Sequence, residues 1–250
     1  RVSGDPPTHF TFAVLEALGL PHAVTTRHCP GIASPSDPVS PFDPESHTLF
    51  APRRLDLSRT VFLRQLHGRD AIRVDDRRGG FVGAGDILVT RTPGLPLAVF
   101  TADCLAIILF DPGRRLLAVA HVGWRGTVKG TVSVAAAALV REGGRSSDLV
   151  AAIGPSIGPC CYEVDRAVID PLRSAFPSEW ELWVTARGGD KWTLDLWRAN
   201  ESQLIAAGVL PERIVNPRLC TACRADLFFS YRKEGSQGRL VTVAALPPAQ

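Results

Sequence analysis

Apolar positions from residue 61 onward follow the short, β-branched pattern that is typical of strands. Gly, Pro or Asp interrupts most of these segments, as expected where a strand ends in a turn. The segments follow one another too closely for a helix to lie between each pair, which argues against a doubly wound parallel sheet. Strands are predicted over residues 61–68, 71–76, 86–91, 97–103, 105–111, 116–124, 149–157 and 239–246.

Helical patterns lie between and beside these strands. Asp165 and Asp195 each precede such a pattern, and Asp is a good N-cap residue. A hairpin with a Gly-Gly-Asp turn is predicted over 181–194. Clustered strands with helices between them predict an α+β fold, in which helices cover mixed sheet layers. The predicted helices cover 11–18, 127–141 and 166–175, and a further one begins at Asp195 and is closed by Gly208.

The segment at residues 28–60 has a different composition. It contains six prolines with Ser and Asp between them, and it shows no helical or strand period. Such composition predicts a long irregular loop or a partly ordered arm. We expect a single domain over residues 1–250 that carries this irregular Pro-rich segment.

Charge and composition exclude several function classes. The net charge is only +3, which argues against nucleic acid and membrane surfaces as partners. No apolar run reaches the roughly 18–20 residues that span a bilayer. Six cysteines in 250 residues do not make a disulfide framework. With no secretion signal in view, we expect reduced thiols, metal ligands or a nucleophile, and a cytoplasmic location.

Three side chains at strand ends are candidates for a metal site. His67, Cys104 and His121 each lie at or near the end of a predicted strand, and two neighbouring strands would bring Cys104 and His121 to one sheet edge. Two imidazoles and a thiolate with an open fourth position suit catalytic zinc, which activates a bound water. A single His or Cys at a strand end is more often only packed or hydrogen-bonded, and this spacing is not a short metal motif.

Polar neighbours extend this candidate site. Asp103 precedes the cysteine and is a candidate proton carrier. Arg125 lies in a Gly-rich turn just before a predicted helix, an arrangement that suits phosphate or carboxylate but is equally common as a structural turn. Arg232 follows an aromatic segment, FFSY, that could stack a base or simply form an amphipathic segment.

The remaining cysteines carry weaker signals. Cys160 and Cys161 are adjacent, which is more often a packing feature than a redox pair. Cys220 and Cys223 form a C-x-x-C motif, but no second pair stands at the spacing of a known zinc motif. Sequence alone therefore favours a structural interpretation for both pairs.

With these residues assembled, the chain resembles the laccase-domain family, also called the YfiH-like or polyphenol oxidase family. The resemblance implies a mixed β-sheet sandwich flanked by helices in α/β/β/α layers, related to cysteine hydrolases and to a bacterial deamidating toxin. It runs across about 61–245 and rests on QLHG (65–68), TADCLAIILFDP (101–112), AHVGWRG (120–126), GPSIGPCCYEV (154–164), and CT followed by FFSYRKEG and GRL (220–240).

The resemblance also implies an activity and a cofactor. It implies zinc on His67, Cys104 and His121, with copper as an alternative ion. It implies phosphorolysis of adenosine, inosine and methylthioadenosine together with adenosine deamination, so that both transferase and hydrolase chemistry are expected. The expected partners are a purine nucleoside and phosphate, and the expected assembly is a monomer or a small homo-oligomer. The expected catalytic residues are Cys104, His67, His121, Asp103 and Arg125, and the expected substrate or phosphate contacts are Arg125, Arg232, Gly154, Tyr162 and Phe229.

One departure and three alternatives accompany this interpretation. Members usually carry a GGxS stretch and an Asn-Leu segment near the N-terminus, whereas residues 25–43 here are Pro-rich and match neither. The alternatives are a cysteine hydrolase acting on an amide such as a peptidoglycan precursor, a copper-dependent polyphenol oxidase, and a binding module without catalysis. A multicopper centre is disfavoured because such centres use close His-x-His pairs, and the nearest two of the six histidines are six residues apart, at 22 and 28.

Overall fold

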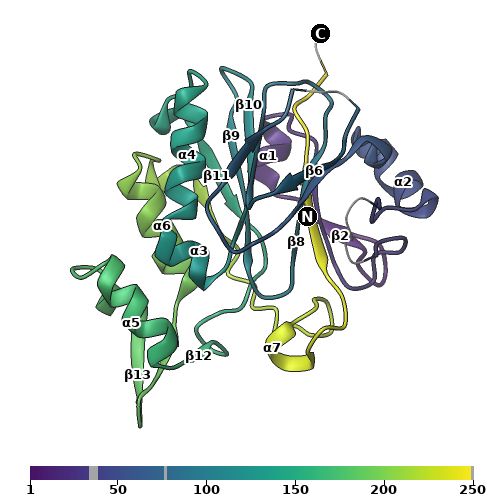
Figure 1. Cartoon of the computed structure of the whole chain (residues 1–250). Coiled ribbons are helices and arrows are strands. Elements are labelled where there is room, and N and C mark those ends of the chain that lie inside the picture. The colour runs from purple at the N-terminus through teal and green to yellow at the C-terminus, as the bar shows by residue number, and fades with distance from the viewer. Residues whose placement is uncertain (34–38, 76–77, 249–250) are drawn as a thin grey trace.

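Two large mixed sheets stack on each other and form the body of the molecule (Figure 1). The structure is a computed structural model that describes residues 1–33, 39–75 and 78–248. In order across the sheet, the first large sheet contains β1 (Val2–Ser3), β2 (His9–Phe10), β3 (His22–Thr25), β16 (Leu240–Ala244), β8 (Leu97–Thr101), β4 (Val61–Arg64) and β6 (Gly80–Ala84). The second contains β15 (Ile214–Val215), β11 (Val150–Ile153), β9 (Leu105–Asp111), β10 (Leu116–Val122), β7 (Ile87–Thr90) and β5 (Ala71–Arg73).

Strand β9 shows why the second sheet is buried on both faces. Its side chains alternate, and all seven residues are buried. Leu105, Ile107 and Leu109 pack in the core under the helices, whereas Ile108 and Phe110 pack in the core between the two sheets. A strand with both faces covered must be apolar at every position, which is the continuous LAIILF run in the sequence.

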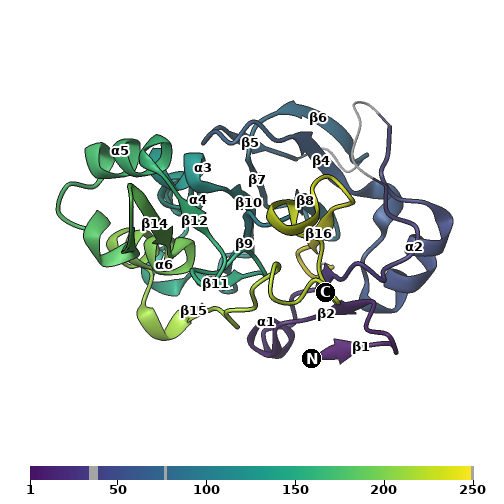
Figure 2. The ribbon, with the colours of Figure 1, turned by 90° about the horizontal axis from the view of Figure 1, so that it is seen from below.

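Helices cover the two outer faces, so the layers run helix, sheet, sheet, helix. Helices α3 (Trp124–Lys129), α4 (Thr131–Arg141) and α6 (Leu196–Ala206) cover the outer face of the second sheet. On the opposite side, α2 (Pro44–Phe50) and the short helices η1 (Ala51–Arg53) and η2 (Leu57–Arg59) cover the first sheet (Figure 2). The predicted α+β sandwich with α/β/β/α layers is confirmed.

The remaining elements are a small third sheet and the other helices. A small third sheet contains β12 (Glu163–Val164), β14 (Lys191–Leu194) and β13 (Val184–Gly188), and it lies beside α5 (Arg166–Ala175). In the part of the chain that the structure describes, no helix is both long and apolar enough to cross a membrane. The other helices are α1 (Ala13–Ala17), α7 (Tyr231–Glu234), η3 (Ser146–Asp148), η4 (Trp180–Trp183) and η5 (Pro211–Arg213).

Several element boundaries differ from the sequence predictions. The helix predicted over 127–141 begins earlier, at Trp124, and divides into α3 and α4, because Gly130 adopts a left-handed conformation with φ 71°. The Pro-rich segment contains α2, whose N-terminus is capped by the Asp43 carboxylate. Pro35 and Pro38 of that segment, and Asp76 at the end of the strand predicted over 71–76, lie outside the described residues.

Candidate metal centre and active site

The three predicted ligands meet at one end of the two sheets. His121 is the second-last residue of β10, and Cys104 lies in the short turn that joins β8 to β9. Strands β9 and β10 are antiparallel, and their register pairs His121 with Ala106, so the end of one strand lies beside the start of the other. His67 reaches the same place from the loop after β4. The predicted placement of Cys104 and His121 at one sheet edge is confirmed.

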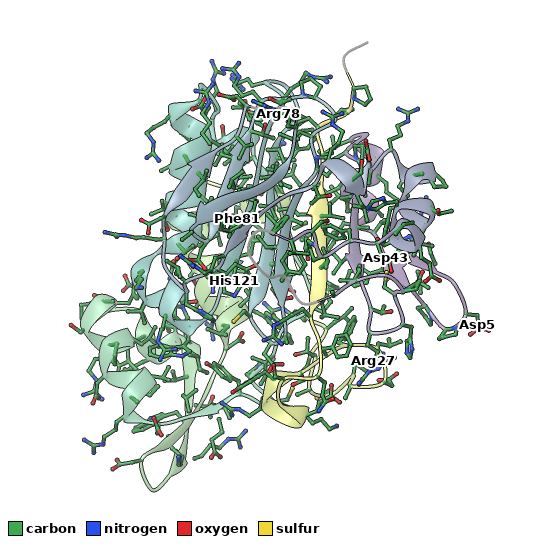
Figure 3. All side chains as sticks on the ribbon, turned by 45° about the vertical axis from the view of Figure 1, so that its right-hand side comes forward. Asp5, Arg27, Asp43, Arg78, Phe81 and His121 are labelled. Carbon is green, nitrogen blue, oxygen red and sulfur yellow. The ribbon has the colours of Figure 1, made fainter. Side chains whose placement is uncertain are left out.

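The three side chains converge on one point. One ligand atom from each of His67, Cys104 and His121 lies within 4.8 Å of the other two. The two imidazole rings stand edge to face with their centroids 4.8 Å apart. His121 is buried, with 3% of its surface exposed, and Figure 3 labels it near the middle of that view.

Asp86 organises two of these ligands, and it is absent from the residues predicted from sequence. Its carboxylate lies 2.7 Å from Nδ1 of His121 and also accepts the backbone N–H groups of Leu66, His67 and Gly68. With Nδ1 donating to Asp86, Nε2 of His121 is the ring nitrogen left to bind a metal, which would take the place of its proton. Burial raises the pKa of Asp86, but the bonds from His121 and Gly68 outweigh it and lower the pKa below its ordinary value.

His67 is held in an unusual backbone conformation. Its φ is 56°, in the left-handed region that residues other than Gly seldom adopt. Besides the bond to Asp86, Lys129 Nζ donates to the carbonyl of His67 at 3.1 Å, and Thr131 donates to the carbonyl of Gly68 at 2.6 Å. The surrounding contacts therefore fix the loop that presents this imidazole.

The thiol of Cys104 and the imidazole of His121 influence each other. Burial raises the pKa of Cys104, but the charge and hydrogen bonds of His121 and His67 outweigh it and bring the pKa to about 6. Burial lowers the pKa of His121, but the Cys104 thiolate and the bond to Asp86 raise it to about 9. At neutral pH the thiolate is favoured, and the thiolate is the form that binds metals or attacks carbon.

Gly123 allows the cluster to close. A Cβ at this position would lie 2.8 Å from Sγ of Cys104 and 3.1 Å from Cδ2 of His67. Real Cβ atoms do not approach so closely, so a side chain here would displace a ligand. The turn between β10 and α3 therefore needs Gly because Cys104 and His67 leave no room for a side chain. Its φ of −87° is one that any residue can adopt.

The cluster lies in the wall of a cavity of about 680 Å³, a size that suits a small molecule. Arg125 lies over the ring of Trp124 at 4.4 Å, and Arg232 lies over the ring of Tyr162 at 5.1 Å. Of the described residues that line the cavity, Asp103 is the one carboxylate, so the lining carries a positive charge that favours an anionic group. The lining arginines are Arg64, Arg125, Arg232 and Arg239.

Asp103 is bound on both carboxylate oxygens. Thr221 donates its hydroxyl to one oxygen at 2.6 Å, and the backbone N–H of Arg232 donates to the other at 2.7 Å. This pairing ties the turn between β8 and β9 to the segment that carries Arg232. Because both of its oxygens already accept hydrogen bonds, Asp103 is better suited to holding these two segments in place than to transferring a proton.

Two predicted substrate contacts lie elsewhere. Gly154 continues the β11–β9 pairing, with its N–H donating to the carbonyl of Ala106 at 2.8 Å. Phe229 packs between Gly238 and the guanidinium of Arg27, which lies 5.0 Å from its ring centroid. Both residues support the frame around the cavity. Cavity residues that the sequence predictions missed include Gln65, Phe100, Trp124 and Tyr231.

Comparison with known proteins decides the family. The sequence profile described as "Multi-copper polyphenol oxidoreductase laccase" matches residues 45–247. The chain belongs to this laccase-domain, YfiH-like family. The match contains His67, Cys104, His121 and Asp86, whereas the Pro-rich stretch at 25–43 lies outside it.

Relatives and a solved structure agree with the laccase-domain assignment. The chain is 40% identical to the Geobacillus stearothermophilus protein named purine nucleoside phosphorylase YlmD, over 74% of this chain and 71% of that protein. It is 36% identical to a protein named adenosine deaminase RL5, from an unknown prokaryotic organism, over 69% of this chain and 66% of that protein. The crystal structure of Bacillus licheniformis YfiH superposes with a TM-score of 0.86 at 29% identity, covering 98% of both chains.

Proposed function

We propose that this chain is a metal-dependent purine nucleoside enzyme that catalyses phosphorolysis of adenosine, inosine and methylthioadenosine and also deaminates adenosine. The observation that carries the proposal is the convergence of His67, Cys104 and His121 in the wall of a cavity lined by four arginines. The names of two relatives, a purine nucleoside phosphorylase and an adenosine deaminase, supply the substrate class.

The donor set fits a single zinc ion. Two imidazoles and one thiolate within 4.8 Å of one another form the three-ligand set of a catalytic zinc site, and Asp86 orients His121 as metal-bound histidines require. Copper accepts the same ligands. A zinc ion bound here would supply Lewis-acid chemistry at the edge of the cavity.

The chain's own residues would bind and orient the two substrates. Arg125 and Arg232 present guanidinium groups held against aromatic rings, which suit the oxygens of phosphate. Tyr162 and Tyr231 line the same cavity and offer flat apolar surface to a purine. Phosphate held by the arginines would attack the anomeric carbon of the ribose as the bond to the purine nitrogen breaks. The electrons of that bond leave with the purine, which takes up a proton from water, and the ribose 1-phosphate that forms stays against the arginines.

A cysteine hydrolase is the second candidate, and one geometric observation supports it. Cys104 and His121 have ligand atoms within 4.8 Å of each other, and His121 is bonded to Asp86, which is the order of nucleophile, base and orienting carboxylate. In this mechanism the Cys104 thiolate would attack an amide carbonyl, the C–N bond would break as His121 protonates the leaving amine, and water would hydrolyse the resulting thioester. A thiol-trapping substrate analogue would then label Cys104, and added zinc would inhibit the enzyme.

An activity screen tests the proposal. Adenosine, inosine and methylthioadenosine are each incubated with and without phosphate, and base release and ammonia release are measured. We expect base release that requires phosphate, ammonia release that does not, and loss of both in Cys104→Ala. Cys29→Ala is the matched control, because Cys29 lies against the first sheet and outside the cavity lining. Phosphorolysis of inosine that survives in Cys104→Ala would refute a shared site.

A further inference from the structure

Four cysteines that the sequence presents as two separate pairs meet in the structure. Cys160 and Cys161 lie in the loop between β11 and β12, and Cys220 and Cys223 lie in the segment between β15 and α7. All are free thiols. We propose that they form a second metal site, separate from the cavity centre, that binds one Zn²⁺ ion through the thiolates of Cys160, Cys161, Cys220 and Cys223. We call these four residues the cysteine cluster.

The spacing of the sulfur atoms suits one tetrahedral ion. All four lie within 4.8 Å of one another, and Sγ of Cys223 is 3.4 Å from Sγ of both Cys160 and Cys161. Zinc–sulfur bonds of about 2.3 Å place tetrahedral sulfur ligands about 3.8 Å apart, which lies inside this range. An iron–sulfur cluster needs thiolates spread around several metal atoms, so one ion fits this spacing better.

The backbone around the cluster is already arranged to receive an ion. The N–H of Gly158 donates to Sγ of Cys220 at 3.3 Å. Bonds from N–H groups stabilise a thiolate, as the ligands of a zinc site require. A parallel bridge between Ser156 and Cys220 holds the two loops in register.

The ligand count assigns the cluster a structural role. Four thiolates complete a tetrahedral zinc shell, so no position remains for a substrate or water. The cluster instead joins two walls of the cavity. Tyr162 directly follows Cys161, and Arg232, from the other wall, lies over the Tyr162 ring. An ion here would fix the relative position of the residues proposed to hold purine and phosphate.

Zinc binding by Cys104→Ala tests the proposal, because this variant loses a ligand of the cavity centre and keeps the whole cluster. Reduced protein is loaded with zinc and dialysed, and its zinc content and zinc-edge X-ray absorption are measured. We expect about one zinc ion per chain, surrounded by four sulfur atoms at about 2.3 Å. Wild-type protein should hold about two ions.

Matched variants distinguish zinc bound at the cysteine cluster from zinc bound elsewhere. Adding Cys160→Ser and Cys223→Ser to Cys104→Ala should remove the remaining zinc, whereas adding Cys29→Ser should leave it. The result for Cys104→Ala stands even if the triple variant fails to fold. The proposal is overturned if Cys104→Ala holds no stoichiometric zinc, or holds zinc in a shell of nitrogen and oxygen. It is also overturned if peptide mapping of the isolated protein finds two cluster cysteines joined in a disulfide. None of these outcomes depends on nucleoside turnover.

Discussion

Among the described residues, two groups of side chains could hold a metal ion, and they differ in the one property that separates catalytic from structural sites. The cavity centre offers three donors, two of them imidazoles, and it faces a cavity of about 680 Å³. The cysteine cluster offers four thiols, two of them exposed at the surface. An incomplete ligand set that faces a cavity leaves room for a reacting group, whereas a complete set does not.

The two groups are also supported differently. Buried Asp86 orients His121 and the His67 loop through side-chain and backbone hydrogen bonds. The cysteine cluster is supported by the backbone N–H of Gly158 and by the pairing of two loops. Changes near the cavity centre should therefore alter the reaction, and changes in the cluster should alter stability and substrate affinity.

The largest effect is expected from Gly123→Ala. The added Cβ would lie 2.8 Å from Cys104 Sγ, so the thiolate or the His67 ring must move. Displacing a reacting group by about 1 Å costs on the order of 100-fold in rate, and we expect kcat/KM to fall at least that far. Zinc content should fall from about two ions per chain to about one.

Gly113→Ala is the control for this steric argument. A Cβ at Gly113 meets only the Asp111 carboxylate, at an ordinary 3.6 Å. This variant should keep wild-type kcat/KM and zinc content. Wild-type activity in Gly123→Ala would show that the tight closure of the three ligands is not needed.

Asp86→Asn should produce the next largest effect. The amide cannot accept at all the positions where the carboxylate accepts from His121 and the 66–68 backbone. Loss of a group that orients a metal-bound His lowers metal affinity or activity by about 10- to 100-fold. Thermal unfolding should show a cost of about 1–3 kcal/mol, because buried N–H donors lose their partner. Unchanged metal affinity would contradict the role given to Asp86.

Arg232→Lys is expected to act mainly on substrate binding. Lysine keeps the charge but loses the flat group that lies over Tyr162 and donates to the Glu163 carbonyl. We expect the KM for phosphate to rise about 10-fold, equivalent to about 1.4 kcal/mol, with kcat nearly unchanged. Arg166→Lys, at an exposed ion pair with Asp190, is the control. A fall in kcat with unchanged KM would place Arg232 in the chemical step.

Cys223→Ser should change catalysis least of the four. The loss of one cluster ligand should leave kcat within about 2-fold and raise the KM by only a few-fold, because the cavity walls are less firmly joined. Thermal unfolding with and without a chelator should show the larger effect, since an ion bound only to the folded state stabilises it. A fall in kcat as large as that of Asp86→Asn would contradict the separation of the two sites.

Some residues of the candidate sites can be predicted from the sequence and others cannot, for a physical reason. Apolar runs stop near His67 and His121, so the sequence indicates two of the side chains that the structure brings together with Cys104, although His67 lies in the loop after β4 and not at the end of the predicted strand 61–68. Asp86 was missed because one acidic residue before an apolar strand looks like a turn residue, and its hydrogen bonds reach a loop about 20 residues before it and strand β10 about 35 residues after it.

The sequence did not predict the cysteine cluster, for a different reason. Each pair is unremarkable alone, and about 60 residues separate them in the sequence. The pairs meet because two distant loops lie side by side, at the parallel bridge between Ser156 and Cys220. The helix predicted over 127–141 also differs from the structure. Its amphipathic pattern continues through Gly130, but the helical backbone is interrupted at that residue.

The most direct test of the central claim is a crystal structure of the zinc-loaded protein with a bound purine nucleoside, measured for anomalous scattering at the zinc edge. We predict an anomalous peak among His67, Cys104 and His121 with the nucleoside in the adjoining cavity, and a second peak at the cysteine cluster without substrate. No peak among His67, Cys104 and His121, or a nucleoside bound away from that cavity, would contradict the account.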